Sequence, residues 1–367
     1  MDPASKLRMK CVLEGLFPSR DKRIQYTKGD RIMKKLLPLL LAALVFAGCS
    51  SDKEITLNLD GEDKTGTYSG DLVDGVPDGN GKFTSKNSDG VEWTYTGEFK
   101  NGHFDGDGQI EWSNGAKEIG TYKDDVIVPE EGDQLNDLFS KTDDYIDHCI
   151  KMKAQCFVDP EKTDDNQYYV QAYPIIDNDI DRSDLLWLYV SGDDFTIKQD
   201  DYFEFTGKVF DTGNGTNAFG TELSAPEITV TDYKVLDYKD ALSPTVYEVD
   251  PAQQQEQNGL EVTVDKVEIS KKETRVYVTV KNGMSDTCMV NAYSAKIVQD
   301  GKQYDVQTNF EGDYAQLSTE VLPGATSSGV ICFDPIEDKD FSFVLGTFSD
   351  NFEIGEQDFN FDIQVDQ

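Results

Sequence analysis

Apolar and polar residues alternate along most of the chain beyond residue 65, and this two-residue period predicts β-strands that bury one face. In the middle of the chain the alternating segments are 150–158, 167–176, 185–191, 202–211 and 226–236. In the last third they are 260–264, 275–280, 289–299, 301–307, 329–333 and 341–345. One short segment has a helical spacing of apolar residues instead, which predicts one amphipathic helix before the middle strands. The residues with this spacing are Leu135, Leu138, Phe139 and Tyr145.

A repeat with a period of 27 residues occupies 66–125. The copies share one tyrosine and four glycines: Tyr68, Gly70, Gly75, Gly79 and Gly81 recur as Tyr95, Gly97, Gly102, Gly106 and Gly108. A fainter third copy begins at Gly120, and four extra residues at 86–89 lengthen one hairpin. The frame resembles MORN repeats, which implies stacked β-hairpins with tight Asn-Gly turns. Because the segment is rich in Asp, we expect a spacer or protein contact surface rather than a lipid-headgroup site.

Residues 33–49 read MKKLLPLLLAALVFAGC, a short basic start, an apolar stretch and small residues before Cys49. The apolar stretch is shorter than the roughly 20 residues that span a bilayer and is typical of a secretory signal. Its end resembles the lipobox of bacterial lipoproteins, which implies cleavage before Cys49 and lipid attachment to this residue. A transmembrane anchor or a buried helix is the alternative. Residues 1–32 do not fit a signal peptide, so we expect translation to start at Met33 and this extension to be non-native.

Two further domains are predicted after a tether at 49–65 and the repeats at 66–125. The helix and five strands of 133–240, with YFEFTGKV in the fourth strand, resemble a small OB-fold barrel. The Pro- and Gln-rich segment 241–258 is predicted to be a linker. The strands of 259–367, with TRVYVTVKN, LPG and GVICF, resemble immunoglobulin-like modules of unknown function in Gram-positive lipoproteins, which implies an antiparallel β-sandwich. The expected fold is therefore mainly β throughout.

The charge of the chain is strongly acidic, with 34 Lys+Arg against 70 Asp+Glu and a net charge of -36. Ten basic and four acidic residues lie in 1–48, so 24 basic and 66 acidic residues remain in 49–367, a net of -42. Such a charge repels nucleic acid and anionic lipid headgroups, because both are bound through Lys and Arg. We therefore expect no nucleic-acid partner, and we expect membrane contact only through the N-terminal lipid.

Aromatic residues on the second and third strands of the predicted barrel are candidates for ligand binding, namely Tyr168, Tyr169, Tyr173, Trp187 and Tyr189. OB barrels bind on the face of these two strands, so some of the five rings are candidates to stack a sugar or a peptide. The alternative is that alternate rings are simply core.

Two further groups of residues are candidates for a calcium site and for a disulfide. Asp177, Asp179 and Asp181 match the start of a calcium loop, but the required Gly and Glu are absent, so an acidic solvated loop is the preferred interpretation. Cys288 and Cys332 are a possible disulfide, although small buried hydrophobic residues are the alternative that we favour.

The sequence offers little catalytic chemistry. It has two histidines, His103 and His148, no nucleophile-elbow motif and no phosphate-binding glycine loop. We expect no enzyme activity, no cofactor and no resident metal. The first hypothesis is a surface-anchored lipoprotein on the outer face of the cytoplasmic membrane that binds or scaffolds another envelope component, either a protein or the cell-wall glycan. A solute or glycan receptor that uses the barrel aromatics is the alternative, and a carboxylate-dependent hydrolase is the third hypothesis.

Overall fold

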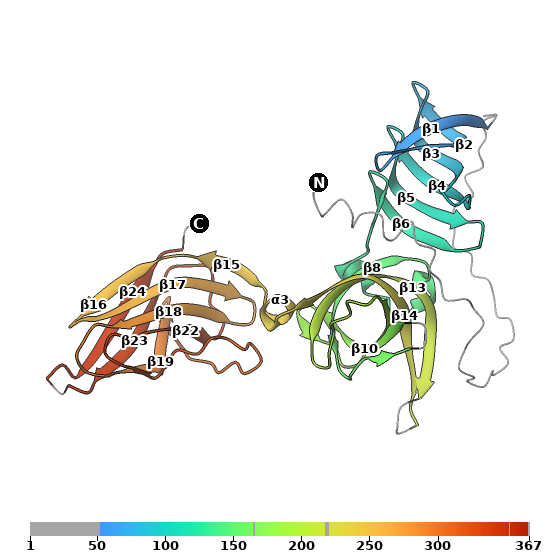
Figure 1. Cartoon of the computed structure of the whole chain (residues 1–367). Helices are drawn as coiled ribbons and strands as arrows, with labels where there is room; N and C mark the ends of the chain where they lie inside the picture. The colour runs from blue at the N-terminus through green and yellow to red at the C-terminus, as the bar shows by residue number, and fades with distance from the viewer. Residues whose placement is uncertain (1–51, 164–165, 217–219, 352, 366–367) are drawn as a thin grey trace. The chain divides into compact units, whose positions relative to one another are not determined.

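The computed structural model describes residues 52–163, 166–216, 220–351 and 353–365, so Cys49, the predicted signal peptide and the N-terminal extension lie outside the described residues. The chain is mainly β, with 63% strand and 4% helix, as the two-residue period predicts (Figure 1). It divides into two compact units, one within the first 234 residues and one formed by 235–367 with two short earlier segments. In the described part of the chain, no helix has the length and apolar character needed to cross a bilayer.

The repeat region forms one antiparallel sheet in which seven strands follow one another in chain order, as the stacked-hairpin prediction requires. The strands are β1 (Lys53–Leu59), β2 (Glu62–Val73), β3 (Val76–Lys86), β4 (Glu92–Lys100), β5 (His103–Trp112), β6 (Lys117–Lys123) and β7 (Val126–Val128). One face carries a core of buried aromatic and aliphatic side chains, among them Tyr68, Phe83, Tyr95 and Phe104.

A row of glycines crosses five neighbouring strands of this sheet and explains the 27-residue repeat. The cross-strand pairs join Gly70 to Gly81, Gly81 to Gly97, Gly97 to Gly108 and Gly108 to Gly120. The ring of Tyr95 lies over the row, and its hydroxyl donates to Glu98 O at 2.9 Å; Tyr68 makes the equivalent bond to Asp71 O at 2.6 Å. A β-carbon on Gly70, Gly81, Gly97 or Gly108 would come within 2.7 Å of Tyr68 or Tyr95, so the tyrosine and the glycines recur together.

The middle strands close into a barrel in the order β8–β10–β12–β14–β13–β8. The long strands are β8 (Cys149–Cys156), β10 (Gln167–Ile176), β12 (Leu186–Ser191), β13 (Tyr202–Thr216) and β14 (Glu222–Leu236); β9 (Glu161–Lys162) and β11 (Asp179–Ile180) pair with β10. β12 and β14 are parallel. Val170, Leu188, Phe205 and Ile228 are buried and alternate with more exposed residues, which is the pattern of a strand with one face in a core.

The single amphipathic helix predicted from Leu135 to Tyr145 is replaced by two short 3-10 helices, η1 (Gly132–Leu135) and η2 (Thr142–Tyr145). Leu138 N and Asn136 N donate to carbonyls three residues earlier, so the turns are tighter than those of an α-helix. Leu135 and Leu138 are buried as expected. The helical spacing of the sequence reflects the burial of these two side chains. A segment of this length can bury them with two 3-10 turns and does not need an α-helix.

The last part of the chain is a sandwich of two sheets around one hydrophobic core. One sheet contains β15 (Thr245–Val249), β16 (Gln253–Gln257), β17 (Leu260–Ser270), β18 (Thr274–Asn282) and β22 (Thr326–Phe333). The other contains β19 (Cys288–Gln299), β20 (Lys302–Asp305), β21 (Glu320–Val321), β23 (Phe341–Ser349) and β24 (Glu356–Ile363). The linker predicted at 241–258 was wrong: α3 (Tyr238–Leu242) ends within it, and β15 and β16 both pair with β17.

Candidate functional site

The candidate site is the outer face of barrel strands β10 and β12. Val170 pairs with Leu188, and both side chains are fully buried, so this register position faces the barrel interior. Because successive side chains of a strand point to opposite faces, Tyr169, Trp187 and Tyr189 face outward. By the same parity Tyr173 also faces outward, so four of the five aromatic residues proposed from the sequence are on one face.

The outward rings form a row that extends onto β13. The ring centroids of Tyr169 and Tyr189 are 5.4 Å apart, and those of Tyr189 and Phe210 are also 5.4 Å apart. Phe210 is 36% exposed, so one end of the row is open to solvent. We name these three residues the aromatic row. The neighbouring rings are inclined to each other by 47° and 65°, so they provide an uneven apolar surface with hydroxyl groups at its margin.

Trp187 lies beside this row, packed against β13. A β-carbon on Gly213 would overlap its six-membered ring, so the absence of a side chain there gives the indole its place. Trp187 is buried, and among the described residues its indole N–H has no hydrogen-bond acceptor. A buried donor without an acceptor costs about 1–3 kcal/mol. Such a group therefore marks a position where an acceptor from a ligand would stabilise the structure.

The electrostatics of the row come from Tyr189 and Glu227 on β14. Burial and the neighbouring carboxylate of Glu227 raise the pKa of Tyr189 well above its usual value. The Tyr189 hydroxyl donates to Glu227 Oε1 at 3.4 Å, a long hydrogen bond. The phenol therefore stays protonated at physiological pH, and its oxygen can accept a hydrogen bond from a ligand hydroxyl while its own proton is directed to Glu227.

The other two candidate aromatic residues have separate partners. Tyr173 stacks on Phe157 with ring centroids 4.3 Å apart. Tyr168 stacks on Phe195 at 3.9 Å, and the Lys162 ammonium lies 5.6 Å from its ring centroid. Tyr168 shares the register face of Val170, so it does not join the outward row. Strand parity therefore separates only Tyr168 from the five-residue set, whereas Tyr173 is set apart by its stacking on Phe157.

The segment considered as a calcium loop is a tight turn between β10 and β11. Asp177 and Asn178 both have positive φ angles, and Ile176 pairs with Asp179 across them. The carboxylate of Asp179 accepts a hydrogen bond from Lys272 Nζ at 2.6 Å, and that of Asp181 accepts one from the Ser183 hydroxyl, also at 2.6 Å. Among the described residues, no cluster of three His, Cys, Asp or Glu side chains has metal-binding geometry.

The possible disulfide between Cys288 and Cys332 is not formed. Both are free, buried thiols, and they lie on opposite sheets of the sandwich, on β19 and β22. Burial raises the pKa of the Cys332 thiol to about 12, so this side chain is a neutral, apolar group.

Each histidine side chain lies within hydrogen-bonding distance of a carboxylate, and the carboxylate of Asp125 also binds the backbone. His103 Nδ1 lies 2.7 Å from Asp125 Oδ2, and the other oxygen of Asp125 accepts from Phe104 N. His148 Nδ1 lies 2.6 Å from Glu130 Oε1. Asp125 therefore joins the start of β5 to the turn between β6 and β7.

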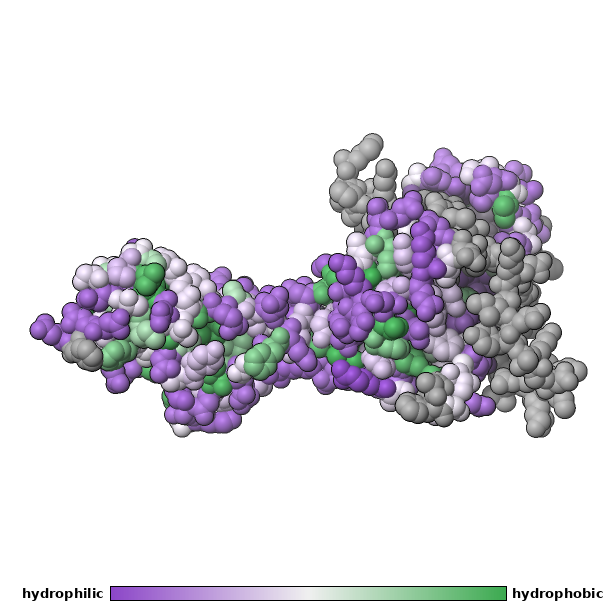
Figure 2. Space-filling model, turned by 60° about the horizontal axis from the view of Figure 1, so that its bottom comes forward, coloured by the Kyte–Doolittle hydropathy of each residue, from purple (hydrophilic) through white to green (hydrophobic). Residues whose placement is uncertain are grey.

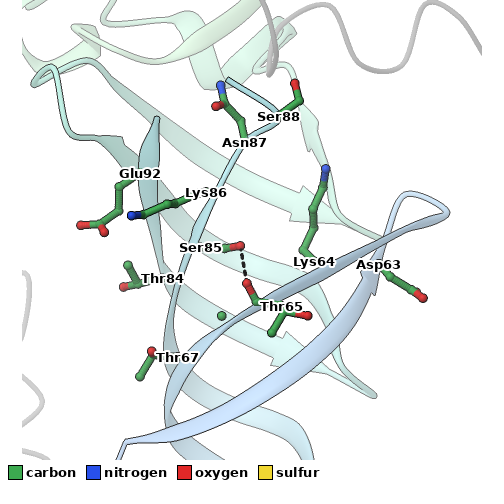
Figure 3. Close-up of a pocket in the computed structure, with 11 residues that line it drawn as sticks. Asp63, Lys64, Thr65, Thr67, Thr84, Ser85, Lys86, Asn87, Ser88 and Glu92 are labelled. Carbon is green, nitrogen blue, oxygen red and sulfur yellow. Dashed lines mark hydrogen bonds between the residues drawn. The ribbon is translucent and has the colours of Figure 1, made fainter. Parts of the chain in front are cut away.

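A shallow polar hollow of about 480 Å³ lies on the repeat sheet (Figure 3). Its wall includes Lys86, Asn87 and Ser88, which belong to the four-residue insertion that interrupts the repeat. Lys86 pairs across the strands with Glu92, and the Ser85 hydroxyl donates to Thr65 O at 2.8 Å. Its lining consists mainly of hydroxyl, amide and charged side chains.

A buried ionic network in the C-terminal domain was not predicted from the sequence. Arg275 on β18 is fully buried; its Nε donates to Glu268 at 2.8 Å and its Nη1 donates to Glu273 at 2.8 Å. The guanidinium also donates to Ser243 and Thr245, so it fixes the start of β15. Only two arginines follow Cys49, and their scarcity was the available signal that one has a special role.

Two family models match parts of the chain. The MORN repeat model matches 68–90 and 95–117, and a model described as a domain of unknown function (DUF4352) matches 240–354. The chain therefore contains MORN repeats and a C-terminal domain of this second family, which begins before the predicted linker ends. No curated protein matches the chain.

Solved structures give only distant likenesses. A functionally unknown protein from Listeria monocytogenes is 13% identical, with 34% of this chain and 88% of that chain covered and a TM-score of 0.28. The yjhA protein from Bacillus subtilis is 15% identical, with coverage of 31% and 96% and a TM-score of 0.25. A conserved domain protein from Bacillus anthracis is 10% identical, with coverage of 77% and 89% and a TM-score of 0.23. TM-scores this low carry no argument about function.

Proposed function

We propose that the protein is a lipid-anchored, non-enzymatic binding module of the bacterial cell envelope, and that the outer face of its barrel contacts another envelope component. The observation that carries this proposal is the aromatic row of Tyr169, Tyr189 and Phe210, with Trp187 beside it. Hydrophilic residues predominate on the face drawn in Figure 2, where hydrophobic residues form small, separate patches. A row of adjoining rings is therefore a distinctive contact surface for this acidic molecule.

We infer that the barrel is an OB-fold. Counted along the chain, its five long strands follow the closed order one, two, three, five, four, one, and the third and fifth are parallel. This order supports the assignment, and strands two and three of such barrels provide the binding face. β10 and β12 are strands two and three here, and they carry two members of the aromatic row. The sandwich, with its two antiparallel sheets around one core, supports an immunoglobulin-like assignment.

The lipid anchor rests on the sequence of 33–49, which ends in small residues before Cys49. We expect a Cys49→Ala variant to leave the membrane fraction for the soluble exported fraction, because the thiol that carries the lipid is gone. Cys288→Ala is the matched control and should stay with the membrane. Equal membrane recovery of the wild type and Cys49→Ala would contradict lipid attachment at this residue.

Cell-wall glycan is the ligand that the aromatic row favours over an envelope protein, because sugar rings present flat C–H faces for stacking and hydroxyl groups for the Tyr189 phenol. We expect full-length protein to co-sediment with purified wall glycan and Tyr189→Ala to bind at least about tenfold more weakly. Tyr293→Ala removes a tyrosine that is 69% exposed on β19 and should bind as the wild type does. If both variants retain full binding, the row is not the contact surface.

In-cell crosslinking of the full-length protein distinguishes the two partner classes. A recurrent envelope protein that is lost in Tyr189→Ala but kept in Tyr293→Ala would assign a protein partner to the barrel face. Release of soluble sugar fragments from the wall by the purified protein would instead support the carboxylate-dependent hydrolase hypothesis. The proposal of a binding module requires that the glycan be recovered intact.

A further inference from the structure

Two edge strands of the C-terminal sandwich are joined by side chains instead of backbone pairing. β16 is an outer strand of one sheet, where it pairs with β17, and β24 is the last strand of the other sheet, where it pairs with β23. Gln253 Nε2 donates to Asp362 O at 2.9 Å, and Gln257 Nε2 donates to Asp358 O at 2.9 Å. Gln255 makes the same bond to Asn360 O between them. We name these three side chains the glutamine ladder.

The ladder satisfies only half of the hydrogen-bonding groups on the open edge of β24. In an antiparallel strand the N–H and C=O of one residue point to the same side. Since the carbonyls of Asp358, Asn360 and Asp362 point toward β16, their N–H groups also point away from β23. Among the described residues, none accepts a hydrogen bond from these three N–H groups. An edge with regularly spaced open donors is a template for another strand.

The charge on this edge indicates which strand would fit. Glu356, Asp358 and Asp362 are exposed on β24, and their side chains alternate with the buried residues of the core. A second copy of β24 docked here would bring carboxylates against carboxylates, which is unfavourable for directly opposed residues. A strand with Lys or Arg at alternate positions would instead place opposite charges across the pair.

We propose that β24 is a docking edge for an extended basic segment of another protein, and that the glutamine ladder covers this edge until the segment displaces it. The incoming backbone would donate to the three carbonyls now bonded by glutamine and would accept from the three open N–H groups. Strand addition of this kind derives affinity from the main chain and specificity from alternate side chains. The interaction is independent of the barrel face, because it uses only residues of the sandwich.

The test uses the full-length protein and a capped peptide of alternating Lys and Val as the probe, with an alternating Glu and Val peptide as its control. Replacing Gln253, Gln255 and Gln257 together by Ala should strengthen binding of the basic peptide at least about tenfold, since the three hydrogen bonds that compete with the peptide backbone are removed. Gln254→Ala is the matched control, because Gln254 lies on the same strand and is exposed. Fluorescence anisotropy measures the affinity, and amide exchange followed by NMR should report new protection of the Asp358, Asn360 and Asp362 N–H groups.

Asn360→Pro keeps the test decisive if the triple variant fails to fold. Proline removes the central open N–H, and edge strands tolerate it where this N–H faces solvent. In the wild-type background this variant should abolish the amide protection caused by the basic peptide. Equal affinities of the wild type and the triple variant, or protection outside β24, would overturn the docking edge. Dimerisation of the triple variant through β24, or equal binding of the acidic peptide, would overturn the basic partner.

Discussion

Replacing Glu268 by glutamine should destabilise the C-terminal domain by about 3 kcal/mol near neutral pH and by much less in acid. The side chain is 1% exposed and accepts hydrogen bonds from Arg275, Lys266, Lys239 and Tyr277. Burial raises its pKa, but these four donors outweigh burial and lower the pKa from 4.5 to about 2. A lowering of the pKa to about 2 corresponds to about 3 kcal/mol of preference for the charged form in the folded state.

The direction of the pH dependence follows from the lowered pKa of Glu268. Below the folded pKa the carboxyl is protonated in both the folded and the unfolded chain, so the contribution is absent there. It develops as the pH rises from about 2 to about 4.5, and it is complete above the unfolded pKa. The Glu268→Gln variant should therefore differ most from the wild type at neutral pH, and the difference should shrink as the pH falls toward 2.

Scanning calorimetry of the full-length chain measures this difference, because the variant identifies which transition belongs to the sandwich. A loss of about 3 kcal/mol corresponds to a lowering of Tm by about 10 °C for a domain of this size. Glu261→Gln is the matched control on the same strand, where Glu261 lies 3.8 Å from Lys281 in a more exposed pair. It should cost less than about 1 kcal/mol. A Glu268→Gln effect as small as the control, or one unchanged between neutral and acidic pH, would refute the reasoning.

Two further predictions concern the repeat sheet and the buried thiol. Gly97→Ala places a β-carbon 2.5 Å from Gly108 Cα and 2.6 Å from the Tyr95 hydroxyl, so urea unfolding followed by circular dichroism should show a loss of about 1–3 kcal/mol. Gly346→Ala, whose β-carbon would meet its nearest neighbour at 3.4 Å, should be almost neutral in the same assay. Cys332 should react with a thiol reagent at neutral pH only when the sandwich unfolds, since burial raises its pKa to about 12; mass spectrometry of the labelled peptide in buffer and in urea checks this, and rapid labelling in buffer would contradict it.

The period-two pattern predicted the strands because each buries one face, and this holds for the sheet, the barrel and the sandwich. The prediction from sequence failed at 241–258, where a composition rich in glutamine and in turn-forming residues indicated a linker. β16 forms there although it has no row of hydrophobic residues. Its glutamine side chains donate hydrogen bonds to carbonyls of β24, and polar side chains with this role give no hydrophobic pattern in the sequence. The sequence pattern therefore predicts strands that bury hydrophobic side chains and misses a strand that is held by polar side chains.

The network around Arg275 was unpredictable for a related reason. Its carboxylates, Glu268 and Glu273, lie within seven residues of it, but β17 turns into β18 between them and brings all three to one buried point. Many acidic residues in this chain have the same local spacing to a basic residue and remain solvated. Only the pairing register of the two strands and the approach of Ser243 and Thr245 separate this set from the others.

The aromatic candidates could have been narrowed from the sequence by comparing the two faces of one strand. On β12 the residues Leu186, Leu188 and Val190 alternate with Trp187 and Tyr189. The interior of a small closed barrel is filled by apolar side chains, so the wholly aliphatic face belongs inside and the face that carries the tryptophan and the tyrosine, with their polar groups, belongs outside. The register with β10 then adds Tyr169 and excludes Tyr168, which no single strand could decide. Phe210 joins the row from β13, which follows β12 and β14 in the strand order, so the aromatic row is a property of the strand order and not of a sequence motif.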